Sequence, residues 1–138
     1  MNVALLDTGP LVALFDVDDV AHSHYRQLLQ QERAGWRLTT TWPCVVEASH
    51  FLSVQTSTRM LQWVEQGGVS IFPFDPEHLH DMRALMQRYT DGRRTRMDFA
   101  DATLVWAATE TAITQVWTID VRDFYRYRLP DGRAFEIL

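Results

Sequence analysis

This sequence predicts a single α/β domain with a mostly parallel sheet, and three observations support that prediction. Short apolar segments typical of buried strands alternate with segments whose apolar residues recur at helical spacing. Strands and helices that alternate in this way are joined by right-handed crossovers, which place helices on both faces of the sheet. The 138 residues contain no internal repeat, low-complexity tract or linker, so we expect one domain over residues 1–138.

Five segments are expected to form the sheet. The first covers residues 2–6, an apolar run that ends at Asp7. Residues 37–41 are rich in threonine and favour a second strand, because β-branched side chains suit a pleated surface. The remaining expected strands are residues 69–72, residues 115–119 and, as an edge strand, residues 134–138.

Helices are expected between these strands. Pro10 suits the first position of a helix that follows the first strand. Asp18 or Asp19 can cap a second helix, which extends to about residue 32 before Gly35 ends it. Further helices are expected from Pro43 onward and over residues 56–65, 77–89 and 99–109, whereas residues 91–95 and 120–123 are expected to be polar loops.

The basic residues exclude several kinds of chemistry. All 13 of them are arginine, and lysine is absent. A P-loop NTPase needs a lysine that reaches the phosphates, and a Schiff-base enzyme needs an amine nucleophile. The formal net charge of −5 argues against a protein that coats nucleic acid by bulk charge, although it allows a local basic rim around an acidic site.

Several features predict a cytoplasmic protein that does not associate with membranes. No apolar run approaches the ~18 residues that span a bilayer. The start of the chain lacks a basic region, and Asp7 interrupts its apolar stretch, which argues against a signal peptide. Cys44 is the only cysteine, so no intrachain disulfide is possible, and we expect it to be a small thiol in the core.

Four isolated acids follow the expected strands or begin the helices after them, and each is bordered by apolar residues. They are Asp7, Glu47, Asp101 and Asp120. Functional groups gather beyond the carboxyl ends of parallel strands, so we expect these acids to converge. Converging carboxylates among core residues are costly to desolvate and raise one another's pKa. A hard divalent cation such as Mg²⁺ or Mn²⁺ removes that conflict because it prefers oxygen ligands.

Each acid also has a simpler explanation on its own. Asp98 or Asp101 fits the N-cap of a helix, and Asp7 can cap the first helix. Asp120 fits a turn. Glu47 lies within a helix among apolar residues, where it can pair with an arginine. The acids therefore indicate a metal site more specifically as a group than any of them does alone.

Two arginine-rich segments border the expected acidic pocket. The first, before Asp98, contains Arg93, Arg94 and Arg96, and the second, after Asp120, contains Arg122, Arg126 and Arg128. They are either solvated loops or a basic rim that guides a phosphate backbone toward the metal. The sequence leaves both interpretations open.

Four stretches, in this order, resemble the PIN-domain ribonucleases, most closely the VapC-type toxins of bacterial toxin–antitoxin pairs. They are Leu-Leu-Asp7-Thr8-Gly9-Pro10, Val-Val-Glu47-Ala, Met97-Asp98-Phe-Ala-Asp101-Ala and Thr118-Ile-Asp120-Val-Arg-Asp123-Phe. The ending, which begins Tyr127-Arg-Leu-Pro, is similar to the tail of this group. The resemblance covers essentially the whole chain, and its motifs are specific in combination rather than singly.

This resemblance implies a three-layer α/β/α fold and an acidic pocket that holds Mg²⁺ or Mn²⁺. Carried over by motif, the catalytic and metal-binding acids are Asp7, Glu47, Asp101 and Asp120. Thr8 and Thr118 are candidate auxiliary hydroxyls, and Asp98 is an added acid that either competes with Asp101 or assists it. The implied reaction is hydrolysis of RNA by an activated water, without a nucleophilic side chain.

The resemblance also implies three partners: an RNA substrate, a cognate antitoxin whose tail enters the active-site groove, and a second copy of the chain in a homodimer. The leading hypothesis is a metal-dependent endoribonuclease that is the toxin of a type II toxin–antitoxin pair. One alternative is the same nuclease fold acting in RNA processing or on DNA without an antitoxin. Another is a non-catalytic module that binds RNA or protein, and the complete set of four acids argues against it.

Overall fold

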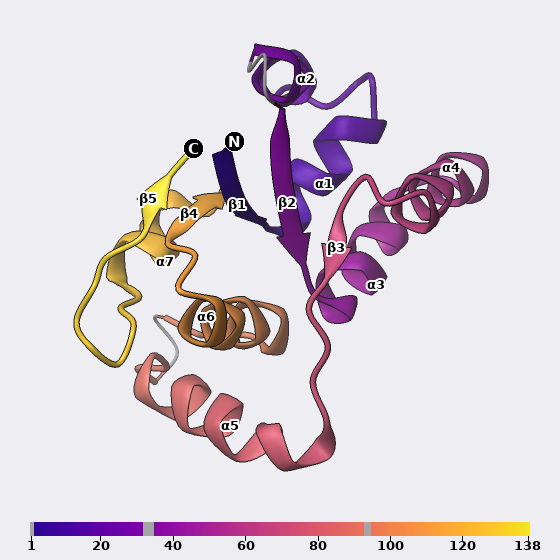
Figure 1. Ribbon diagram of the computed structural model, residues 1–138. Helices are drawn as coiled ribbons and strands as arrows, with labels where there is room; N and C mark the ends of the chain where they lie inside the picture. The colour runs from indigo at the N-terminus through magenta and orange to yellow at the C-terminus, as the bar shows by residue number, and fades with distance from the viewer. Residues whose placement is uncertain (1, 32–34, 93–94) are drawn as a thin grey trace.

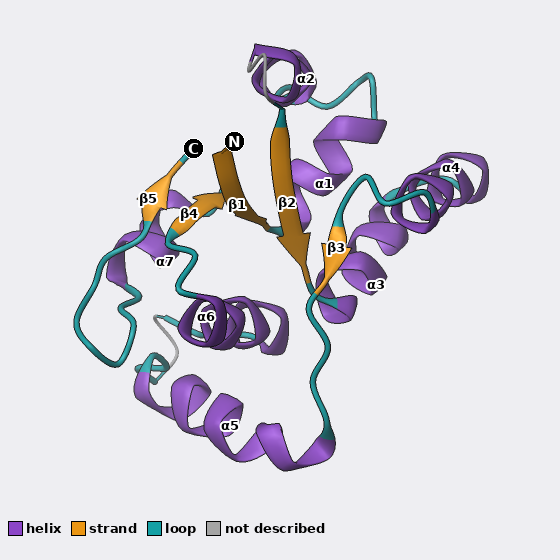
Figure 2. Cartoon of the chain, in the orientation of Figure 1, coloured by secondary structure: helices purple, strands orange, loops and turns teal. Residues whose placement is uncertain are grey.

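The computed structural model describes residues 2–31, 35–92 and 95–138, which form one five-stranded sheet (Figures 1 and 2). The strands are β1 (Asn2–Leu6), β2 (Trp36–Thr40), β3 (Ser70–Ile71), β4 (Gln115–Trp117) and β5 (Glu136–Ile137). Their order in the sheet is β3-β2-β1-β4-β5, and every pairing between neighbours is parallel. The predicted mostly parallel sheet is confirmed, with β1 at its centre.

The helices form a layer on each face of this sheet. They are α1 (Thr8–Phe15), α2 (His22–Gln31), α3 (Trp42–Phe51), α4 (Val54–Glu65), α5 (Leu79–Arg88), α6 (Phe99–Thr111) and α7 (Val121–Arg126). Figure 1 shows α1 to α4 on one side of the sheet and α5 and α6 on the other. In the part of the chain that the structure describes, no helix is both long and apolar enough to cross a bilayer.

Alternation along β1 explains the two apolar cores of this three-layer arrangement. Successive side chains of a strand point to opposite faces of a sheet. Ala4 and Leu6 accordingly pack in the cluster formed with α1 to α4, whereas Leu5 packs in the cluster formed with α5 and α6. A central strand that is buried on both faces has a continuous run of apolar residues, and this pattern predicted β1. The expected three-layer α/β/α fold is confirmed.

Several expected boundaries are wrong. The expected caps Asp18 and Asp19 lie ahead of α2, which begins only at His22, and β4 ends at Trp117 rather than at residue 119. The helix expected over residues 77–89 is divided into a short 3₁₀ helix, η1 (Pro76–His78), and α5. The loop expected over residues 120–123 is instead the start of α7, because Phe124 is fully buried and anchors the segment as a helix turn against the core. The end of the second helix near residue 32 lies outside the described residues.

Cys44 is a buried free thiol, as expected. Burial raises the pKa of this thiol to about 12, and the charge of Asp7 adds to the effect. A thiol that stays protonated at neutral pH is a poor nucleophile. Cys44 therefore belongs to the core and not to the chemistry of the site.

The segments that follow β1 and β4 lie close together. A Cβ on Gly9, at the start of α1, would lie 2.9 Å from Cδ1 of Ile119. Glycine at this position allows the connection after β4 to approach the first turn of α1. The carboxyl ends of two neighbouring strands are thereby drawn to one point at the edge of the sheet.

Candidate metal centre

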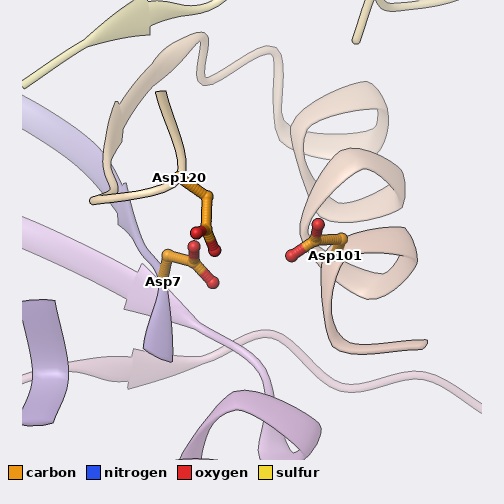
Figure 3. A group of neighbouring side chains, drawn as sticks. All are labelled: Asp7, Asp101 and Asp120. Atoms are coloured by element: carbon orange, nitrogen blue, oxygen red, sulfur yellow. The ribbon is translucent and has the colours of Figure 1, made fainter. Parts of the chain in front are cut away.

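Three aspartates converge at the carboxyl edge of the sheet (Figure 3). Asp7 directly follows β1, Asp120 precedes α7, and Asp101 lies in the first turn of α6. One carboxylate oxygen of each lies within 4.8 Å of the other two. We call Asp7, Asp101 and Asp120 the acidic triad. The fold thus brings together three of the four acids that the sequence analysis selected.

Asp7 is the most deeply buried member of the triad. Its side chain is 2% exposed and occupies the N-cap position of α1. The Oγ1 of Thr118 donates to Oδ2 over 2.7 Å, and the backbone N–H of Thr8 donates to Oδ1 over 2.8 Å. Burial raises the pKa of Asp7 from 3.8 to about 7, even though both hydrogen bonds act to lower it. The carboxyl group is therefore fixed in position but costly to ionise.

Asp101 is the second buried member, and a tyrosine holds it. The hydroxyl of Tyr127 donates to Oδ2 of Asp101 over 2.7 Å. Burial, and then the charges of Asp7 and Asp98, raise the pKa of Asp101 from 3.8 to about 8. Burial and the charge of Asp101 also raise the pKa of the Tyr127 hydroxyl, which keeps it a donor.

Asp120 is exposed and connects the buried pair to solvent. Its backbone N–H donates to Oγ1 of Thr118 over 3.0 Å. Thr118 therefore bonds to both Asp7 and Asp120 and fixes their spacing. Partial burial, and then the charges of Asp123 and Asp98, raise the pKa of the Asp120 carboxyl.

Glu47 lies in α3 beside the triad rather than within it. The Oγ1 of Thr8 donates to Oε2 of Glu47 over 3.3 Å, so Thr8 bonds to both Asp7 and Glu47. Burial, and then the charge of Asp98, raise the pKa of this half-buried glutamate. Among the described residues, Glu47 forms no ion pair with an arginine. Both predicted auxiliary threonines thus form hydrogen bonds with the acids. Thr8 bonds to Asp7 and Glu47, and Thr118 bonds to Asp7 and Asp120.

Asp98 has a clear structural role as the N-cap of α6. Its Oδ1 accepts a hydrogen bond of 2.8 Å from the backbone N–H of Asp101. The cap explanation therefore holds for Asp98 and not for Asp101. Its negative charge still acts on the site, because it raises the pKa of Asp7, Glu47 and Asp101.

Two of the selected arginines lie near the triad. Arg96 and Arg122 line a cleft of about 430 Å³ together with Asp120. Both are exposed. Arg93 and Arg94, which the sequence analysis placed on the same rim, lie outside the described residues.

The other two arginines of the second basic segment are bound to the protein itself. Arg126 is half-buried on α7, and its Nη2 donates to the backbone oxygen of Tyr89 over 3.4 Å. The Nη1 of Arg128 donates to the backbone oxygens of Tyr125 and Tyr127 over 2.7 and 2.8 Å. This segment is therefore not a solvated loop, and these two guanidinium groups stabilise the end of α7.

Tyr127 is the site residue that sequence reasoning missed. The sequence places it only in the C-terminal stretch that is similar to the tail of the family. Its contact with Asp101 joins residues 26 positions apart, which no local pattern predicts. The available signal is its place at the start of that stretch, Tyr127-Arg-Leu-Pro.

The acidic triad suits a hard divalent cation. All of its side-chain donors are carboxylate oxygens, the ligands that Mg²⁺ and Mn²⁺ prefer. Two of the three acids are buried, and in the described part of the chain no arginine or histidine forms an ion pair with any of them. A buried carboxylate pair without a cationic side chain is stabilised either by protons or by a metal ion.

Comparison with known proteins agrees with the fold. No curated protein sequence matches this chain. VapC20 of Mycobacterium tuberculosis, a toxin that cleaves the sarcin-ricin loop, superposes with a TM-score of 0.75 at 13% identity, covering 88% of this chain and 92% of VapC20. A chain of a toxin–antitoxin complex from Klebsiella pneumoniae gives a TM-score of 0.61 at 17% identity, covering 98% and 95% of the two chains.

At these identities the structural likeness establishes a shared fold. The sequence profile of the PIN domain matches residues 4–129, a range that extends from β1 to beyond α7 and includes all three aspartates of the triad. The match spans well over half of the chain. This protein therefore belongs to the PIN domain family.

Proposed function

We propose that this protein is a metal-dependent endoribonuclease and the toxin of a type II toxin–antitoxin pair. The observation that supports the proposal most directly is the acidic triad, in which three carboxylates from separate elements meet within 4.8 Å at the carboxyl edge of a PIN-domain sheet. Such a cluster is costly in a structural protein, because it opposes folding unless a cation is bound. Its presence favours a catalytic role over a passive binding role.

Asp7, Asp101 and Asp120 are the residues that would hold the ion, which we propose to be Mg²⁺ or Mn²⁺. When bound, a divalent cation supplies Lewis-acid chemistry, since it makes water more acidic and offsets the charge that develops on a phosphate. Thr8 and Thr118 keep the Asp7 carboxylate in position for this role. No nucleophilic side chain is needed for such a hydrolysis.

Glu47 serves either as a further ligand or as the group that orients the attacking water. Its carboxylate lies on the same cleft as Asp120, and Thr8 fixes its Oε2 oxygen. Burial and the charge of Asp98 raise the pKa of Glu47, which makes it a stronger proton acceptor than an ordinary glutamate. Glu47 would therefore orient a water molecule between itself and Asp120 and accept a proton from it.

Arg96 and Arg122 are the groups that we propose to bind the phosphates of the RNA. Both are exposed, and both line the cleft beside Asp120. Guanidinium groups bind phosphate oxygens in a bidentate manner and position a nucleic acid without reading its sequence. The same contacts are proposed for Arg93 and Arg94, whereas the bonds of Arg126 within the protein favour a structural role.

An antitoxin is the second proposed partner. The likeness to VapC20, a toxin, and to a chain of a toxin–antitoxin complex supports this proposal. A cleft of about 380 Å³ beside the triad is lined by Asp16, Asp19, Glu47 and Asp120 and also by apolar groups such as Phe51. Acidic walls with an apolar side fit a peptide that contains arginine and apolar residues. Such a toxin acts in the cytoplasm, which is the location that we propose.

A homodimer is the third proposed assembly. Trp42, Val46 and Phe99 are between 39% and 56% exposed, and they line one cleft of about 670 Å³ together with Glu47. Apolar residues gathered in one place on a surface are typical of interfaces between proteins. A second copy seated on this cleft would cover these side chains next to the site.

An RNA cleavage assay tests the proposed function. Wild-type protein is expected to cleave RNA with added Mg²⁺ or Mn²⁺ and to lose this activity in a chelator. Asp7→Asn and Asp101→Asn are expected to slow cleavage by about 100-fold or more, the scale of losing a group that stabilises transition-state charge. Asp81→Asn is the matched control, because Asp81 is an exposed acid of α5 away from the triad.

Three results would contradict parts of the proposal. Undiminished cleavage in a chelator, or equal cleavage by wild type and both triad variants, would reject the metal-dependent mechanism. Cleavage of DNA but not RNA would favour the alternative nuclease. Binding of RNA without cleavage under any metal condition would favour a non-catalytic module.

A further inference from the structure

The ring of Tyr127 is locked in the core at the end of α7. Its side chain is fully buried. The rings of Tyr89 and Phe124 pack edge-on against it, each with a centroid distance of 5.1 Å and with interplanar angles of 68° and 72°. A ring held on two sides in this way presents its hydroxyl in one direction only.

The hydroxyl of Tyr127 points at a site carboxylate. It donates to Oδ2 of Asp101 over 2.7 Å, a good distance for a hydroxyl donor. Within the described residues, Oδ1 of Asp101 has no hydrogen-bond partner and so stays available to a ligand. The tyrosine thus binds one oxygen of the carboxylate and leaves the other free.

The same helix also places a second member of the triad. Asp120 immediately precedes α7, and Tyr127 immediately follows it. One short helix therefore determines the position of Asp120 directly and that of Asp101 through the tyrosine hydroxyl. These two acids come from segments that share no strand and no helix.

We propose that Tyr127 is a positioning residue that orients the Asp101 carboxylate for a divalent cation. The inference rests on the metal-dependent function proposed above. A carboxylate rotates about its last side-chain bond unless it is held, and a rotated Asp101 no longer presents an oxygen toward Asp7 and Asp120. Hydrogen bonds to metal ligands from surrounding groups commonly change metal affinity by about 10- to 100-fold.

Mn²⁺ binding by a Tyr127→Phe variant is the first test. The substitution removes one oxygen and keeps the ring. We expect it to weaken Mn²⁺ binding by about 10- to 100-fold, measured by the electron paramagnetic resonance signal of free Mn²⁺. Unchanged Mn²⁺ affinity in this variant would overturn the inference.

Tyr89→Phe is the matched control for that experiment. Tyr89 is a buried neighbour in the same aromatic cluster, and its hydroxyl bonds to the backbone N–H and oxygen of Arg128 rather than to an acid. We expect this variant to lose thermal stability to a similar extent but to bind Mn²⁺ within about 2-fold of wild type. Equal weakening of Mn²⁺ binding in both variants would show a general loss of structure and would contradict a positioning role.

A double-mutant cycle tests whether Tyr127 acts through Asp101. In an Asp101→Asn background, adding Tyr127→Phe is expected to change Mn²⁺ affinity less than 2-fold, because the group that it orients is already altered. Two independent, multiplicative losses would contradict the inference.

A crystal structure of the Mn²⁺-loaded wild type provides a test that requires no variant. We expect the Tyr127 hydroxyl to remain on Asp101 while an oxygen of that carboxylate faces the ion. A hydroxyl turned away from Asp101 would overturn the inference. Wild type that binds Mn²⁺ without cleaving RNA would defeat the proposed function and leave the role of Tyr127 intact, whereas wild type that binds no Mn²⁺ would defeat both.

Discussion

Asp7 and Asp101 are expected to hold protons near neutral pH when no metal is bound. Burial raises the pKa of Asp7 to about 7 and that of Asp101 to about 8. Two neighbouring acids titrate as a pair, so protons leave the site in steps that belong to both. A cation that binds here must displace these protons.

The first prediction concerns the stability of the metal-free protein as a function of pH. Folding raises the pKa of the Asp7 carboxyl from 3.8 to about 7. At low pH this carboxyl is protonated in both the native and the unfolded protein, and its burial there does not reduce the free energy of unfolding. The unfolded chain ionises first as the pH rises, so the free energy of unfolding should fall between about pH 4 and pH 8. Urea denaturation in the presence of a chelator measures this decline.

Asp7→Asn should flatten that decline, because the amide cannot ionise. Near pH 8 the variant should melt a few degrees above wild type, since about 1 kcal/mol corresponds to roughly 3–5 °C for a chain of this size. Asp81→Asn, at an exposed position of α5, serves as the control and should follow the wild-type curve. A steeper decline in Asp7→Asn than in wild type would refute the protonated state of the pair.

The structure also shows why residue patterns identified the acids but not their supports. Asp7, Glu47, Asp101 and Asp120 stand out because each interrupts an apolar segment. Tyr127 is itself consistent with an apolar core, so nothing local distinguishes it from a packing residue. Its function depends on a partner that only the folded chain brings within 2.7 Å.

Helix α6 begins at a residue that has two separable properties, a cap and a charge. Asp98 accepts the backbone N–H of Asp101, and its carboxylate raises the pKa of that same aspartate. A serine at this position keeps the acceptor and removes the charge, whereas an alanine removes both.

The second prediction uses this difference. Asp98→Ser should keep wild-type stability and most of the RNA cleavage, and Asp98→Ala should lose about 1 kcal/mol of stability with the cap. Thermal melting and the cleavage assay measure the two effects. If both variants retain the fold but lose cleavage equally, Asp98 is a member of the catalytic set and not only a cap.

Short elements were the hardest part of the fold to predict from the sequence. The long strands and the helices with clear apolar spacing were predicted to within a few residues, as β1 and α6 illustrate. Helix α7 has only six residues, and its segment contains charged groups and an aspartate that favours turns. Packing of Phe124 in the core outweighs that local preference.

The charge of the molecule as a whole is negative, but its distribution around the site is not uniform. The net charge of −5 would repel an RNA at a distance. Arg96 and Arg122 place positive charge at the edge of the cleft beside Asp120. RNA binding should therefore depend on a few local contacts and respond strongly to their loss.

The third prediction separates these arginines from those that stabilise the fold. Arg122→Ala should weaken RNA binding and reduce the slope of its salt dependence by about 1, the effect of losing one phosphate contact. Arg126→Ala should instead lower the melting temperature, because it leaves the backbone oxygen of Tyr89 without this donor. Binding measured over a salt series, together with thermal melting, tests both. An unchanged salt slope in Arg122→Ala would show that Arg122 forms no phosphate contact with the RNA.

The hydrogen bond from Thr118 to Asp7 joins residues 111 positions apart. A ribosome that is making this chain adds Asp7 111 residues before Thr118, and Asp120 and α7 follow Thr118. A nascent chain interrupted before that point lacks a member of the triad and the hydroxyl that spaces it. The triad can therefore assemble only after the ribosome has added Asp120 and α7 to a chain that already contains Asp7.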